Sequence, residues 1–426
     1  MKAKTLALFA LLAALALVVA GCGGNGGDDE AAGDGTPTQT ETAQTQTGME
    51  MDHGGDGASA VESEATDVRM TLGRLMGEHA LLAQFATQKG FAGQEDFEAI
   101  GQSLDANSVD LADTIGSVYG DEARQQFLDG DNMWRDHIQF FVDYTTALAQ
   151  EDQAGQDQAV QNLQAYVGEF STFLAEATGA PQEAVTEAIN EHVMQLKGQI
   201  DAWAANDFQT SYPLLREGYA HMYMTSDAVS GAIIEQQDLD NGNVNEAAAG
   251  LRQTLGRLLG EHTILAIVAT QKGFRGEEDF EQIAAALDAN AVELADAIGS
   301  VYGDEARTQF LDGEHMWRDH IRYFVDYTTA LAQEDQAGQD QAVQNLQAYV
   351  GEFSAFLAEA TGLPQEDLSD GISMHVDQLK GQIDAFAAGD HTQAYETTRE
   401  AYHHMWDTAT LLSGAIVEGN PEAFSG

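Results

Sequence analysis

The chain has 426 residues and a formal net charge of −52, because 70 acidic residues accompany only 18 Lys and Arg. Such a charge repels nucleic acid and anionic membrane surfaces, so neither is an expected partner. A single cysteine excludes a disulfide framework, and five prolines with abundant Ala, Gln, Glu and Asp indicate a helical protein large enough for two domains.

The first residues have the form of a secretion signal. Lys2 and Lys4 precede an apolar run over residues 6–20, which is too short for a permanent membrane span. The segment 19–22, Val-Ala-Gly-Cys, resembles the lipobox of bacterial lipoproteins, in which the cysteine is acylated. We therefore expect cleavage before Cys22 and a lipid anchor that holds the protein on the extracytoplasmic side of the cell membrane. An ordinary signal peptide that contains a cysteine by chance is the alternative.

Residues 23–65 consist mainly of Gly, Asp, Thr, Gln and Glu, with few large apolar side chains. Such a segment cannot bury enough surface to offset the entropy of ordering, so it is predicted to be a disordered tether. Met49, Met51 and His53 lie within it and could hold copper weakly, or could be a chance cluster.

Helical periodicity then extends over residues 66–236 and again over 250–419. In the first stretch it is interrupted at Gly90, Gly93, Gly120, and near residues 152–155, 179–181 and 206–207, which divides it into six helices. The polar residues 237–249 form a linker, and 420–426 form a tail. The predicted fold is all-α, with two tandem helical-bundle units of about six helices each.

Four helices of the first unit each carry a histidine on an apolar stripe. His79, His137, His192 and His221 recur at spacings of three and four with apolar neighbours, which places them on buried helix faces. Each lies near the middle of its helix. Because the middles of neighbouring helices in a bundle fall in one layer, the four imidazoles are expected to converge.

The second unit repeats this pattern 183 residues later, with His262, His320, His375 and His404. Residues 134–179 and 317–362 are nearly identical, so agreement there shows only a recent duplication. From residue 181 to 234 the copies differ at about half of the positions. The pairs retained there include His192/His375, Glu217/Glu400, Tyr219/Tyr402, His221/His404 and Met222/Met405.

Four converging imidazoles predict a site for a transition metal, with copper or zinc before iron. A carboxylate one turn before the fourth histidine could replace or orient an imidazole. The predicted ligands are His79, His137, His192, His221 and Glu217, with His262, His320, His375, His404 and Glu400. The predicted supporting groups are Asn107, Tyr166, Tyr219 and Met222, with Asn290, Tyr349, Tyr402 and Met405. Methionine sulfur near the histidines slightly favours copper over zinc as the bound metal.

Two further expectations follow from the histidines. Imidazoles must be neutral to ligate, so metal should be released as the pH falls below about 6. The acids that precede three of the histidines, Glu78, Asp136 and Glu191, point about 100° away from them and are expected at the edge of the stripe. Arg74, Arg135 and Arg216 are their expected partners.

Two other interpretations remain open. Buried histidines could be hydrogen-bonded core groups of a structural or interaction module, since an unsatisfied one costs about 1–3 kcal/mol. Haem held by two histidines is a further alternative, although there is no Cys-x-x-Cys-His segment for covalent haem. Ferritin-like Glu-x-x-His pairs do not recur, and no nucleophile or phosphate-loop motif is present, so nothing requires an enzyme.

Several short segments are similar to a family of secreted bacterial all-helical proteins, some of which carry a copper amine oxidase label. They are residues 72–79, Leu-Gly-Arg-Leu-Met-Gly-Glu-His, with 88–90, 119–120, 141–144 and 221–224. The resemblance covers most of both units and implies a secreted helical module associated with copper. No motif for a self-processed tyrosine cofactor accompanies it, so the oxidase activity is not carried over.

Overall fold

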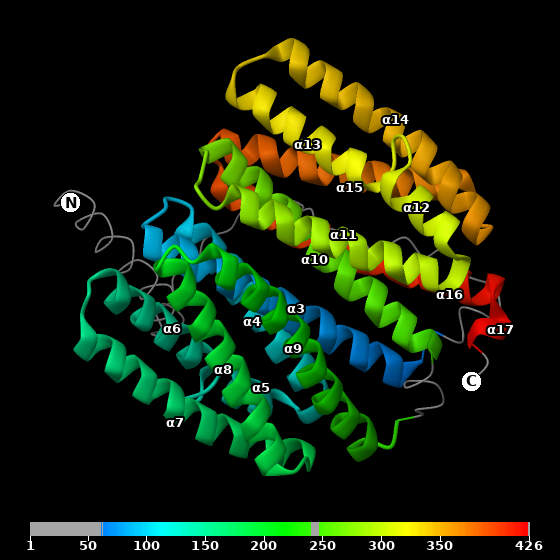
Figure 1. Cartoon of the computed structure of the whole chain (residues 1–426). Helices are drawn as coiled ribbons and strands as arrows, with labels where there is room; N and C mark the ends of the chain where they lie inside the picture. The colour runs from blue at the N-terminus through cyan, green and yellow to red at the C-terminus, as the bar shows by residue number, and fades with distance from the viewer. Residues whose placement is uncertain (1–60, 62, 240–246, 425–426) are drawn as a thin grey trace, which may run out of the picture.

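The computed structural model describes residues 61, 63–239 and 247–424, and these form helices and connecting turns without a strand (Figure 1). The lipobox, the segment around His53 and most of the predicted tether and linker lie outside the described residues. The predicted all-α fold with two groups of packed helices is confirmed. Among the described residues, no helix is both long enough and apolar enough to cross a membrane.

The helices of the first group occupy residues 64–236. They are α3 (Glu64–Ala92), α4 (Phe97–Tyr119), α5 (Asp121–Asp129), α6 (Trp134–Ala149), α7 (Gln153–Thr178), α8 (Gln182–Ala204) and α9 (Phe208–Gln236).

The second group repeats this order. It contains α10 (Ala247–Arg275), α11 (Phe280–Tyr302), α12 (Asp304–Asp312), α13 (Trp317–Ala332), α14 (Gln336–Thr361), α15 (Gln365–Ala387) and α16 (His391–Gly419), followed by the short α17 (Pro421–Phe424).

One helix expected between Gly120 and residue 152 is interrupted. The chain ends α5 at Asp129 and begins α6 at Trp134, with Asn132 at a φ of 54° between them. The Asp136 carboxylate accepts a 2.7 Å hydrogen bond from the Asn132 backbone N–H, which stabilises the turn. Asp136 therefore serves the start of α6, and the turn places Trp134 and His137 in the first turn of a new helix.

The helices α3 and α10 form the centre of their units, and most of their residues from the second turn onward are buried. Glycines allow other helices to approach them closely. A Cβ at Gly77 would overlap the Tyr223 hydroxyl, and one at Gly256 would overlap the Trp406 ring. These contacts pack α3 against α9, and α10 against α16.

The two units meet along α3, α4, α9, α10, α11 and α16, which lie at the middle of the molecule in Figure 1. Residues at equivalent positions of the two units contact each other, and Tyr223 stacks on Trp406 in this way with ring centroids 6.1 Å apart. The hydroxyl oxygens of Tyr219 and Tyr402 are 3.5 Å apart, and Gln94 Nε2 donates to Glu277 Oε1 at 2.8 Å, with 183 residues separating the members of each pair. A residue that meets its own counterpart indicates approximate twofold symmetry between the units.

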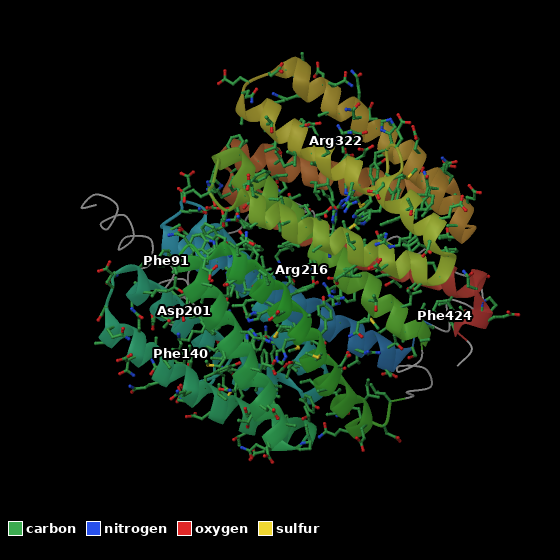
Figure 2. The ribbon with its side chains drawn as sticks, in the orientation of Figure 1. Phe91, Phe140, Asp201, Arg216, Arg322 and Phe424 are labelled. Atoms are coloured by element: carbon green, nitrogen blue, oxygen red, sulfur yellow. The ribbon has the colours of Figure 1, made fainter. Side chains whose placement is uncertain are left out.

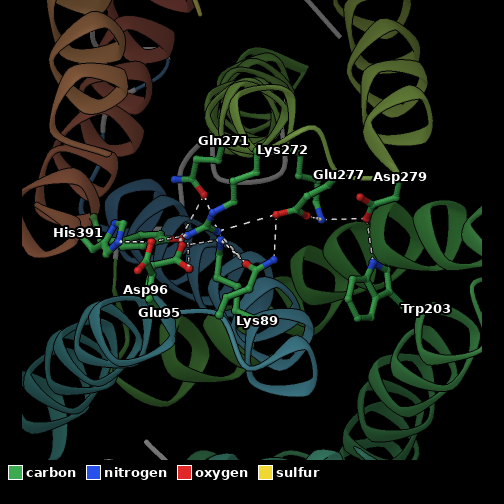
Figure 3. A network of polar contacts seen from close by, with 12 residues as sticks. Lys89, Glu95, Asp96, Trp203, Gln271, Lys272, Glu277, Asp279 and His391 are labelled. Carbon is green, nitrogen blue, oxygen red and sulfur yellow. Dashed lines mark hydrogen bonds and ion pairs between the residues drawn. The ribbon is translucent and has the colours of Figure 1, made fainter. Parts of the chain in front are cut away.

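Buried ion pairs stabilise one end of this interface (Figure 3). Lys89 Nζ lies 2.7 Å from Asp96 Oδ2, and Asp96 also accepts hydrogen bonds from Arg275 and Tyr395 of the other unit, each at 2.9 Å. The equivalent group in the second unit is Lys272 and Asp279, with Tyr212 and Trp203 of the first unit as donors. Each unit thus supplies donors to a buried carboxylate of the other.

Candidate metal centre

Three helices of the first unit bring their histidines to one place. His79 of α3, His137 of α6 and His192 of α8 each offer a ring nitrogen, and these three atoms lie within 4.8 Å of one another. The Nε2 atoms of His79 and His137 are 3.4 Å apart. All three side chains are buried. We call this group the first triad.

The second unit contains the equivalent second triad. His262 of α10, His320 of α13 and His375 of α15 are buried and have ring nitrogens within the same 4.8 Å limit. The Nε2 atoms of His262 and His320 are 3.2 Å apart. The two triads have the same arrangement although α8 and α15 differ in sequence.

Aromatic rings hold the imidazoles in place. The His137 ring stacks on Tyr166 with centroids 4.6 Å apart and an angle of 18° between the planes. Trp134 packs against both His79 and His137, at centroid distances of 4.6 and 4.9 Å. Tyr349 and Trp317 do the same in the second unit. Because these rings are packed on several sides, each imidazole has little freedom to rotate.

Burial keeps the triads neutral. It lowers the pKa of His137 to about 3 and that of His192 to about 4, with additional repulsion from His192 and His221 respectively. The pKa of His79 lies well below its ordinary value for the same reason, reinforced by His137 and His192. Neutral rings are the form that binds metal. The low pKa values of His137 and His192 therefore favour the metal-binding form of these rings in the folded protein.

Several buried ring nitrogens have no hydrogen-bond partner among the described residues. In the triads they include Nδ1 of His79 and His262 and both nitrogens of His375; Nδ1 of His221, outside the triads, is another. Buried polar groups in native proteins are almost always paired, so each such atom calls for a physical explanation. A hydrogen-bonded polar core would leave the nitrogens of His375 without partners among the described residues.

The fourth histidine of each unit does not join the triad. His221 Nε2 donates to the Ala188 carbonyl at 3.0 Å, and His404 Nε2 donates to the Gly371 carbonyl at the same distance. Each therefore ties the last helix of its unit to the preceding helix. Glu217 and Glu400 are exposed. The structure thus brings together three of the expected ligands in each unit and leaves His221, His404, Glu217 and Glu400 outside.

The predicted supporting groups take three different positions. Tyr166 and Tyr349 stack on triad histidines, as described above. Met222 and Met405 are buried beside cavities that also contact His192 and His375. Tyr219 and Tyr402 lie at the interface between the units and do not contact a triad histidine.

Asn107 and Asn290 support the triads indirectly. Asn107 Nδ2 donates to Glu78 Oε2 at 2.8 Å and to the Leu75 carbonyl at 2.9 Å. Asn290 makes the equivalent bonds to Glu261 and the Leu258 carbonyl. Since Glu78 directly precedes His79 in α3, Asn107 fixes the turn of helix that carries a triad histidine.

Sequence reasoning missed the partners of these glutamates. Glu78 is fully buried, not at the edge of its stripe, and its Oε1 lies 2.8 Å from Arg399 Nε of the other unit. Glu261 pairs in the same way with Arg216, at 2.8 Å. Figure 2 labels Arg216 near the middle of the molecule. Burial alone would raise the pKa of Glu78, but His403 and Arg399 lower it to about 2.

Three imidazoles can bind Zn²⁺ or copper and leave a coordination position for another ligand. Among the described residues, no carboxylate or thiolate joins the three imidazole nitrogens of either triad. Comparison of the chain with protein-family models, curated proteins and solved structures finds no match. The functional assignment therefore depends on the geometry of the triads.

Proposed function

We propose that each triad binds one transition-metal ion, copper or zinc before iron, and that the protein captures, stores or buffers this metal on the extracytoplasmic side of the membrane. A lipid at Cys22 would anchor it there. The observation that carries the proposal is the equivalent, buried clustering of three imidazoles in both units.

The main alternative is a structural or interaction module in which the histidines only fill the core. It requires that buried imidazoles be satisfied by hydrogen bonds. Instead, the hydrogen-bond partner of His79 Nε2 is another imidazole nitrogen, at 3.4 Å, and His79 Nδ1 lacks a partner among the described residues. A metal ion would replace the weak contact between the rings with strong bonds to each.

The ligand set suits both copper and zinc. Imidazole is a good ligand for either ion, and Cu²⁺ binds more tightly than Zn²⁺ at a given nitrogen site. Buried Met222 and Met405 add sulfur beside the triads, and the resemblance to copper-labelled secreted proteins points the same way. The net charge of −52 would in addition concentrate cations around the molecule.

The metal content of the purified protein tests the proposal directly. The full chain, purified without a histidine tag and exposed to Cu²⁺ or Zn²⁺, should hold two tightly bound ions, and His137→Ala should hold one. His137→Ala with His320→Ala should hold none. His221→Ala with His404→Ala is the matched control, since these histidines lie outside the triads, and should keep two ions.

The opposite results would identify an alternative. A folded chain that takes up neither ion would support the structural module. A Soret band in protein purified from its source would support haem.

A further inference from the structure

An apolar cavity lies beside the third histidine of each triad. In the second unit it has an empty volume of about 960 Å³, including space open to solvent, and contacts His375. Its other lining residues include Leu255, Trp317, Phe353, Ile372, Met405 and Leu412. The equivalent cavity of the first unit contacts His192 and has an empty volume of about 570 Å³.

The third histidine is the member of each triad that is nearest to solvent. His192 is 8 % exposed, whereas His79 and His137 are 1 % exposed. In the second unit, His375 is 4 % exposed, compared with 0 % for His262 and 1 % for His320. The least buried imidazole of each triad therefore lines this cavity, whereas another cavity of the first unit contacts His79 and His137.

A surface groove leads to this cavity in the first unit. The groove runs between α7, α8 and α9, past Gly179, Pro181 and Ala188. It shares four lining residues with the inner cavity, namely Leu174, Ile189, Thr225 and Val229. The groove and the inner cavity therefore adjoin each other at these four side chains.

His375 points to a ligand at the inner end of the second cavity. Its ring is buried, it lines the cavity, and both of its nitrogens lack a hydrogen-bond partner among the described residues. A metal bound by the triad would satisfy one nitrogen. Because the triad supplies only three protein donors, such a metal would keep a position for a fourth ligand.

We infer that this fourth position is filled from the cavity by a small molecule that has an apolar body and a single nitrogen or sulfur donor atom. The inference rests on the proposed metal site. The apolar lining favours an apolar body, as in ordinary small-molecule pockets. A small anion such as azide is attracted by the charge of the metal but lacks an apolar body, so it makes few contacts with the cavity wall.

Cobalt spectroscopy tests this ligand class, because Co²⁺ absorbs visible light in a way that reports its coordination. The protein is the full chain with His137→Ala, which leaves only the second triad intact. Co²⁺ binding is measured first, and 4-phenylimidazole or azide is then added. We expect one Co²⁺ per chain, a spectrum that changes with 4-phenylimidazole at low concentration, and a much weaker response to azide.

A substitution at the cavity rim provides the second part of this test. Ile372→Trp should fill the cavity and weaken 4-phenylimidazole binding by at least about tenfold, since small changes in apolar pockets have effects of this size. Met374→Trp is the matched control, because Met374 lies two residues away in α15 and is 45 % exposed. An unchanged Co²⁺ spectrum before ligand addition shows that either variant keeps an intact site.

The outcomes separate the two proposals. If Co²⁺ binds but 4-phenylimidazole leaves its spectrum unchanged, or binds no better than azide, the ligand inference is wrong and the metal site stands. If Ile372→Trp and Met374→Trp bind 4-phenylimidazole equally, the ligand does not occupy this cavity. If no Co²⁺, Cu²⁺ or Zn²⁺ binds, both proposals fail.

Discussion

Glu78 and Arg399 form an ion pair between the two units, with Oε1 and Nε 2.8 Å apart and the carboxylate fully buried. Glu261 and Arg216 repeat this pair with the roles of the units exchanged. Each glutamate directly precedes a triad histidine, His79 or His262. The interface and the candidate metal centres therefore share the same helical turns of α3 and α10.

Removal of either arginine should destabilise the protein, and Arg216→Met should cost more than Arg399→Met. Loss of one partner from a buried pair typically costs about 3–5 kcal/mol. Without Arg399, Glu78 keeps His403 at 3.3 Å and Asn107 at 2.8 Å. Position 220, the counterpart of His403, is alanine, so Glu261 has no such substitute. Denaturant unfolding of the two variants measures the difference.

A double-mutant cycle separates the ion pair from general packing. Glu78→Gln with Arg399→Met should recover much of the stability that Arg399→Met loses, because no unpaired charge remains buried. Additive losses from the two substitutions would show that the pair is not coupled.

The metal-free protein should lose stability as the pH falls from about 6.5 toward 4. In the unfolded chain histidine has a pKa near 6.5, whereas burial lowers the pKa of His137 to about 3 and that of His192 to about 4. Below pH 6.5 the unfolded state thus binds protons that the folded state does not, and this favours unfolding by about 1.4 kcal/mol per pH unit for each histidine. Unfolding free energies at pH 7, 6 and 5 measure the slope.

His137→Asn with His320→Asn should make this pH dependence shallower by the contribution of two histidines. Glu78 does not interfere, since its pKa falls from 4.5 to about 2 on folding, and the stability it contributes is lost only below about pH 4.5. An equal slope in the variant and the parent would show that the triad histidines are not neutralised by folding.

Helix packing at the glycines of α3 and α10 can be tested with alanine. Gly256→Ala should destabilise the protein by about 1–3 kcal/mol, because the added Cβ would overlap the Trp406 ring. Gly351→Ala in α14 is the control, since a Cβ there meets no atom within 4 Å. It should stabilise by about 0.5–1 kcal/mol through the higher helix propensity of alanine. Thermal or denaturant unfolding of both variants compares the signs.

The proposed lipid anchor predicts where the protein is found in cells. The parent should fractionate with membranes and carry acyl groups detectable by mass spectrometry. Cys22→Ala should remove the acyl groups and shift the protein to the soluble or secreted fraction. An acyl-free parent in the soluble fraction would support the ordinary signal peptide instead.

Helical periodicity was sufficient to find the triad histidines, but not to distinguish them from His221. The stripe of each helix shows which side chains face inward, and His79, His137 and His192 meet because α3, α6 and α8 pack against one another. His221 also faces inward, yet its ring reaches the Ala188 carbonyl of α8 first. The spacing of apolar residues along a helix does not determine how far that helix is rotated about its axis relative to its neighbour.

The buried state of Glu78 could not be predicted from the stripe of α3. Local periodicity describes how a helix packs within its own unit, and there Glu78 lies toward the edge. Packing of the second unit covers this edge and brings Arg399 to it from 321 residues away. Arg216 and Arg399 occupy equivalent positions in the two units, which is a sequence signal for a role of these arginines. That signal did not identify the buried glutamates as their partners.

Crystals grown with Cu²⁺ or Zn²⁺ and measured at the absorption edge of the metal would test the central claim most directly. The proposal predicts one anomalous peak among His79, His137 and His192 and a second among His262, His320 and His375, each within bonding distance of three imidazole nitrogens. Peaks found only at exposed carboxylates, with both triads unchanged and empty, would contradict it.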